Sequence, residues 1–79
     1  MPIRSYVIYP DPERFDALEA ELGNHPACSV HPSDRRELMV LVTETETRAA
    51  DKELYGWLNK HPAIQNLTLS FADVEENNA

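Results

Sequence analysis

The sequence has little cysteine, glycine or positive charge. Its 79 residues include one cysteine, two glycines and 7 basic side chains against 14 acidic ones, which gives a formal net charge of -7. The lone Cys28 excludes an internal disulfide, and two glycines exclude a glycine-rich phosphate-binding loop. The acidic surplus repels phosphate backbones, so we expect no nucleic acid among the ligands and favour a cationic peptide or protein instead.

Long apolar runs are also missing. The sequence contains no stretch of about 18 apolar residues, which a membrane-spanning helix would need. The start, Met1-Pro2-Ile3-Arg4, lacks the basic segment, apolar core and cleavage site of a secretory signal. We therefore expect a cytoplasmic protein with no membrane insertion. A chain this short forms a single thin hydrophobic core and leaves little room for a deep catalytic cleft, so we do not expect an enzyme.

Hydrophobic periodicity predicts four strands and two helices. The expected strands are residues 3–9, 28–31, 37–43 and 64–71, and the expected helices are residues 12–22 and 47–60. The final residues are acidic and rich in asparagine, with almost nothing to bury. We therefore expect one domain over residues 1–72 and a disordered acidic tail over residues 73–79.

Residue types at the helix ends support these boundaries. Asp11 is expected to cap the first helix, and Thr47 or Thr45 the second, because short polar side chains accept hydrogen bonds from free N–H groups there. Gly23 is expected to end the first helix in the left-handed conformation. Gly56 lies inside the second helix, where glycine costs about 1 kcal/mol relative to alanine, so we expect a close packing contact there.

An internal repeat predicts the fold. Leu22-Gly-Asn-His-Pro-Ala27 matches Leu58-Asn-Lys-His-Pro-Ala63, and each copy lies between an expected helix and an expected strand. Two similar β-α-β halves make up an α+β, ferredoxin-like β-α-β-β-α-β sandwich, in which both helices cover one face of a four-stranded antiparallel sheet. Right-handed crossovers place the first and third strands at the centre.

The other face of such a sheet is open. In the first strand, Tyr6 and Ile8 are expected to face the helices. In the third strand, the more apolar set, which includes Val40 and Val42, is assigned to the helices, so its neighbours are expected on the open face. That face then has an apolar centre and polar sides, as peptide-binding surfaces do. The predicted peptide-binding residues are Val7, Tyr9, Met39, Leu41, Thr68 and Ser70.

Two alternatives stay open for this face. Central strands can be apolar on both sides through strand propensity alone, without a ligand. A register error of one residue would also exchange the two faces of a strand.

No catalytic or metal site, and no cofactor, is predicted. His25, His31 and His61 form no pair at helical spacing, and Cys28 has no nearby soft-ligand partner. Cys28 also lies on an expected strand, where burial disfavours the thiolate that a nucleophile needs. The pair Arg35-Arg36 lies in an expected hairpin with no apolar stretch after it, so we interpret it as a solvated turn.

Several segments, in their order and spacing, resemble the NapD family. They are Ser5-Tyr-Val-Ile ahead of Pro12-Glu-Arg, His25-Pro-Ala-Cys-Ser-Val-His31, Glu37-Leu-Met-Val-Leu-Val42, and Trp57-Leu-x-x-His-Pro-Ala-Ile-x-x-Leu-Thr-Leu-Ser-Phe71. The resemblance covers Ile3 to Glu76. The chain departs from the family at Ala27 and Ala63, where glycine is usual, and at Ser29, where an acidic residue is usual.

The resemblance implies a cytoplasmic chaperone rather than an enzyme. Proteins of this family bind the twin-arginine signal peptide of the catalytic subunit of periplasmic nitrate reductase, and delay its export until the molybdenum cofactor is inserted. The chaperone itself then needs no cofactor and acts as a monomer or weak dimer. The alternative is a regulatory ferredoxin-like module that binds a small ligand or dimerises through its open sheet face.

Overall fold

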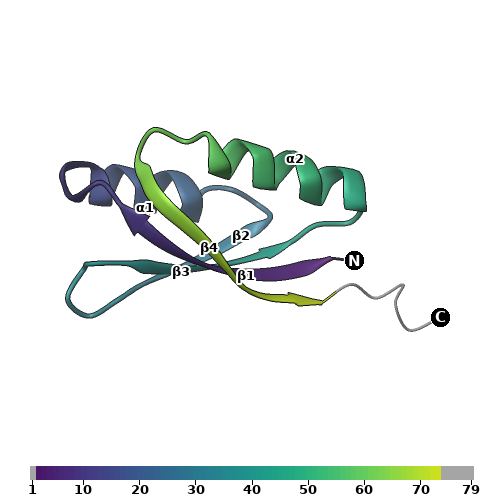
Figure 1. Cartoon of the computed structure of the whole chain (residues 1–79), viewed down its shortest axis with the longest axis horizontal. Coiled ribbons are helices and arrows are strands. Elements are labelled where there is room, and N and C mark those ends of the chain that lie inside the picture. Colours follow the sequence, from purple (N-terminus) through teal and green to yellow (C-terminus); the bar gives the residue numbers. More distant parts are fainter. Residues whose placement is uncertain (1, 74–79) are drawn as a thin grey trace.

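The computed structural model describes residues 2–73 of the chain (Figure 1). In chain order the elements are β1 (Ile3–Pro10), the 3-10 helix η1 (Pro12–Arg14), α1 (Phe15–Gly23), β2 (Cys28–Pro32), β3 (Met39–Glu44), α2 (Arg48–Asn59) and β4 (Ile64–Asp73). The strands form one antiparallel sheet in the order β2-β3-β1-β4. Both helices lie on the same side of it (Figure 1). The predicted α+β, ferredoxin-like fold, with β1 and β3 at the centre, is confirmed.

β4 is two residues longer than the expected strand over residues 64–71. β4 continues through Asp73, which we had assigned to the tail. The remainder of the predicted acidic tail, residues 74–79, lies outside the described residues.

Both predicted cap residues act as caps, Asp11 for the 3-10 helix η1 that precedes α1 and Thr47 for α2, but the two glycines do not act as expected. Asp11 accepts a hydrogen bond from the Glu13 N–H at 3.0 Å, and Thr47 accepts one from the Ala50 N–H at 3.0 Å. Gly23 does not adopt a positive φ, so the expected left-handed cap is wrong. The last turn of α1 instead closes through the Asn24 N–H, which donates to the Ala20 carbonyl, and the His25 N–H, which donates to the Leu22 carbonyl, both at 3.1 Å. A Cβ on Gly56 would meet nothing within 4 Å, so the expected close contact is also wrong.

The internal repeat is a repeated turn. In each copy the histidine Nδ1 accepts a hydrogen bond from the alanine N–H two residues later, at 3.1 Å for His25 and 3.0 Å for His61. Because Nδ1 accepts, a neutral ring carries its proton on Nε2, from which His61 donates to Glu21 at 2.8 Å. The Trp57 ring lies 5.9 Å from the His25 ring and 5.2 Å from the His61 ring. Trp57 therefore packs against both turns.

The core lies between the helices and the sheet. The inward set of β1 is confirmed. The buried apolar residues are Tyr6, Ile8, Phe15, Leu18, Leu22, Met39, Leu41, Leu54, Leu58 and Ala63. Cys28, Val30 and Leu67 pack against this cluster.

The face assigned to β3 is wrong by one residue. Met39 and Leu41 have 0% of their surface exposed, whereas Val40 and Val42 are only partly buried. The reason is the pairing with β1, in which Tyr6 is opposite Leu41. Residues directly opposite one another in an antiparallel pair share a face, so the inward direction of β1 dictates that of β3. Met39 and Leu41 belong to the core and not to the open face.

Candidate functional site

The face of the sheet away from the helices is the candidate site. Strand pairing aligns its residues in rows that cross the sheet. One row is His31, Val40, Val7 and Thr68, and the next is Ser29, Val42 and Ser5. Val7, Val40 and Val42 are half-buried by their neighbours, and neither α1 nor α2 covers this side (Figure 1).

Four of the six predicted site residues remain candidates. Val7 lies in the centre of this face, and Tyr9 and Thr68 lie on it with exposed side chains. Ser70 is exposed and falls where the β1–β4 register shifts, and its hydroxyl donates to the Ser5 carbonyl at 2.9 Å. The structure thus brings Val7, Tyr9 and Thr68 together.

Sequence reasoning missed Val40 and Val42. These two valines take the central place that the prediction gave to Met39 and Leu41. The signal that could have found them is the pairing of β3 with β1, since Val40 is opposite Val7. The corrected site keeps its predicted character, with an apolar centre.

The sides of this face are polar. Serine, histidine, threonine and asparagine side chains line it on the two edge strands, at Ser29 and His31 on β2 and at Asn66 and Thr68 on β4. At one end Glu44 is exposed opposite Ile3. An apolar centre with a polar rim and a carboxylate at one end suits an amphipathic peptide that carries positive charge.

The Arg35-Arg36 hairpin is exposed, as predicted, but Arg36 also contacts α1. Its guanidinium lies 4.4 Å from the centroid of the Phe15 ring and forms ion pairs with Asp16 and, at 3.8 Å, with Glu19. Arg36 also has a φ of 58°, a conformation that a non-glycine residue adopts only when its surroundings hold it there. This arginine therefore ties the β2–β3 loop to α1.

The structure gives Cys28 no activated thiol. The side chain faces the core, and burial raises the pKa of the Cys28 thiol to about 11. A raised pKa lowers the thiolate fraction that a nucleophile or metal ligand requires.

Among residues 2–73 no three His, Cys, Asp or Glu side chains gather as a metal site would require. No helix in this part of the chain is long and apolar enough to cross a membrane.

Comparison with known proteins identifies a similar solved structure and a matching family. The solution structure of the E. coli Tat proofreading chaperone protein NapD is similar to this one, with a TM-score of 0.75 and 21% sequence identity, covering 94% of this chain and 79% of that one. At this identity the similarity establishes a common fold. No curated protein sequence matches the chain. The family model of the NapD protein matches residues 1–76, and the chain therefore belongs to the NapD family.

Proposed function

We propose that this protein is a cytoplasmic chaperone of a periplasmic nitrate reductase. It binds the twin-arginine signal peptide of the catalytic-subunit precursor and delays export until the molybdenum cofactor has been inserted. Membership of the NapD family supports this role, as does the fold shared with an E. coli protein described as a Tat proofreading chaperone. The observation that carries the proposal is the uncovered sheet face centred on Val7, Val40 and Val42.

The apolar centre supplies the affinity. A helical signal peptide would lay its apolar side across the three valines, which are half-buried already. Covering what remains exposed contributes about 1 kcal/mol per side chain. Thr68 and Tyr9 border this contact and offer hydroxyl groups to the polar part of the peptide.

The negative charge of the chain attracts the cationic signal peptide. A domain with net charge -7 attracts a peptide with two arginines and increases the rate of encounter. Glu44 lies at the end of the open face, within reach of an arginine that extends past the apolar contact. The protein catalyses no reaction in this scheme, and the molybdenum cofactor belongs to the client.

Titration calorimetry with the signal peptide of the co-encoded molybdoenzyme tests the proposal. Wild-type protein should bind the peptide, and a peptide with both arginines replaced by neutral residues should bind more weakly. Val40→Glu should abolish binding and leave the melting temperature close to wild type, because this side chain is partly exposed in the free protein. Ala17→Glu is the matched control, since it adds the same charge on the exposed side of α1.

Two results would contradict the proposal in different ways. A folded Val40→Glu protein with full affinity would show that the peptide binds away from the open face. A wild-type protein that does not bind the peptide at all would reject the signal-peptide function. In that case a concentration-dependent dimer in analytical ultracentrifugation that Val40→Glu abolishes would favour self-association through the same face.

A further inference from the structure

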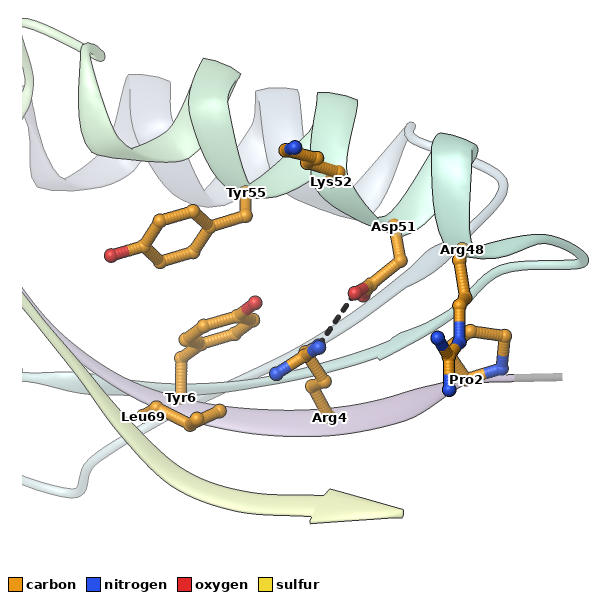
Figure 2. Close-up of a pocket in the computed structure, with 8 residues that line it drawn as sticks. All are labelled: Pro2, Arg4, Tyr6, Arg48, Asp51, Lys52, Tyr55 and Leu69. Atoms are coloured by element: carbon orange, nitrogen blue, oxygen red, sulfur yellow. Dashed lines mark hydrogen bonds and ion pairs between the residues drawn. The ribbon is translucent and has the colours of Figure 1, made fainter. Parts of the chain in front are cut away.

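A concave site lies on the helix side of the sheet, between α2 and the strands β1 and β4 (Figure 2). It has a volume of about 560 Å³. It is open because the second half of β4 extends away from α2 (Figure 1). As a result Leu69 is 46% exposed although it pairs with the buried Tyr6, and Tyr55 on α2 is 45% exposed. We call this site the α2 cleft.

The α2 cleft is positively charged in an acidic protein. Among the described residues, Arg4, Arg48 and Lys52 line it together with the carboxylate of Asp51. The whole chain has the opposite balance, with 14 acidic and 7 basic residues. A local reversal of charge of this kind concentrates anions at the cleft.

Arg4 is held in place by a buried partner. Asp51 is 5% exposed, and its Oδ2 accepts a hydrogen bond from the Arg4 Nε at 2.7 Å. Only the Nε of this guanidinium is bonded to Asp51. Within residues 2–73, its two terminal amino groups have no hydrogen-bond acceptor. A guanidinium fixed at one edge presents its remaining N–H groups in a rigid fork, which suits a carboxylate.

Tyr6 adds a second donor beside an apolar wall. Figure 2 shows the Tyr6 hydroxyl on the side of the ring nearest Arg4, whereas the Tyr55 hydroxyl is directed away from it. In the part of the chain that the structure describes, the Tyr6 hydroxyl has no hydrogen-bond partner. Burial, with the Asp51 charge as a smaller cause, raises the pKa of Tyr6 to about 12, so the phenol stays protonated and can donate. The Tyr6 and Tyr55 rings stack with centroids 6.1 Å apart, and Leu69 continues this apolar surface.

We propose that the α2 cleft binds a carboxylate attached next to an apolar side chain. Arg4 and Tyr6 donate hydrogen bonds to the carboxylate, and Tyr55 and Leu69 contact the apolar group. Asp51 favours a monoanion over a phosphate, because a nearby carboxylate repels a second negative charge more strongly. The required chemistry is that of a peptide ending in an apolar residue, or of a free N-acyl amino acid. The cleft and the open sheet face lie on opposite sides of the sheet, so this proposal is independent of the proposed function.

Nuclear magnetic resonance titration of the full chain with small probes tests the proposal. N-acetyl-L-leucine should shift the amide signals around Arg4, Tyr55 and Leu69 and bind in the millimolar range, as expected for about a dozen non-hydrogen atoms. N-acetyl-L-leucinamide lacks the carboxylate and N-acetylglycine lacks the apolar side chain, and each should bind at least about tenfold more weakly. A tripeptide ending in leucine distinguishes the sources: tighter binding than N-acetyl-L-leucine favours a chain end, and equal binding favours a free small carboxylate.

The variants are chosen so that the fold survives. Arg4→Gln combined with Asp51→Asn removes the cation without leaving a buried charge unpaired, and it keeps the net charge. It should abolish binding of N-acetyl-L-leucine. Tyr6→Phe removes only the hydroxyl and should weaken binding by about three- to tenfold. Arg35→Gln, in the exposed hairpin, is the control for a lost arginine and should bind like wild type.

The proposal is overturned by any of three results. One is that N-acetyl-L-leucinamide binds as well as the acid. Another is that the folded Arg4→Gln/Asp51→Asn protein keeps its affinity. The third is that the signals that shift lie on the open sheet face instead of around the cleft.

Discussion

Leu41 and Val40 are neighbours in β3 but lie on opposite sides of the sheet, so truncating each to alanine should separate stability from peptide binding. Leu41 is 0% exposed between the sheet and the helices. Leucine-to-alanine changes at such sites cost about 2–5 kcal/mol in the free energy of unfolding, through lost transfer energy and the cavity left behind. For a domain of this size 1 kcal/mol shifts Tm by about 4–8 °C, so Leu41→Ala should melt at least about 8 °C lower.

Val40 should give the opposite result. Its side chain is partly exposed in the free protein, so Val40→Ala should lower the free energy of unfolding by less than about 1 kcal/mol. If the signal peptide covers this valine, the same change removes about two methylene equivalents from the interface and weakens binding by about three- to tenfold.

Thermal melts by circular dichroism, paired with calorimetric titration of the signal peptide at 10 °C, measure both effects. Leu41→Ala should melt early yet bind with wild-type affinity wherever it is folded. The reversed pattern, with Val40→Ala unstable and Leu41→Ala stable but defective in binding, would refute the argument that pairing with β1 sets the face of β3.

Three further predictions concern single residues and the solvent. Gly56→Ala should raise the free energy of unfolding by up to about 1 kcal/mol and raise Tm in a melt, because nothing obstructs a Cβ there and alanine favours the helix; a lower Tm would contradict this. The pKa of the Cys28 thiol is raised to about 11 from 9.0, so Cys28 should react with a maleimide at pH 8 about 100-fold more slowly than an exposed thiol; equal reactivity would show that the thiol is exposed. The contribution of this thiol to the free energy of unfolding should be complete below pH 9 and lost as the pH rises towards 11. In stopped-flow measurements, higher ionic strength should mainly slow association of the signal peptide, and Glu44→Gln should reduce that dependence; affinity that vanishes at about 0.5 M salt would contradict an apolar contribution from Val40.

The sequence alone was sufficient for the order of elements and the fold, because those depend on local signals. Asp11 and Thr47 cap their helices through neighbouring N–H groups, and the apolar stripes of the helices follow helical spacing. The His-Pro-Ala turns at His25 and His61 are closed by bonds that span two residues. Because these interactions join residues that are close in the sequence, they can be predicted from the sequence alone.

The tertiary structure decided which side of β3 is buried. Both alternating sets of this central strand are apolar, so periodicity does not distinguish Val40 from Leu41. The choice rests on partners far away in the chain, such as Val7 opposite Val40. The α2 cleft has the same origin, since Arg4 and Asp51 are 47 residues apart and meet only after the sheet and α2 have packed. Contacts between distant segments depend on the whole chain's packing, and no local pattern of residues encodes them.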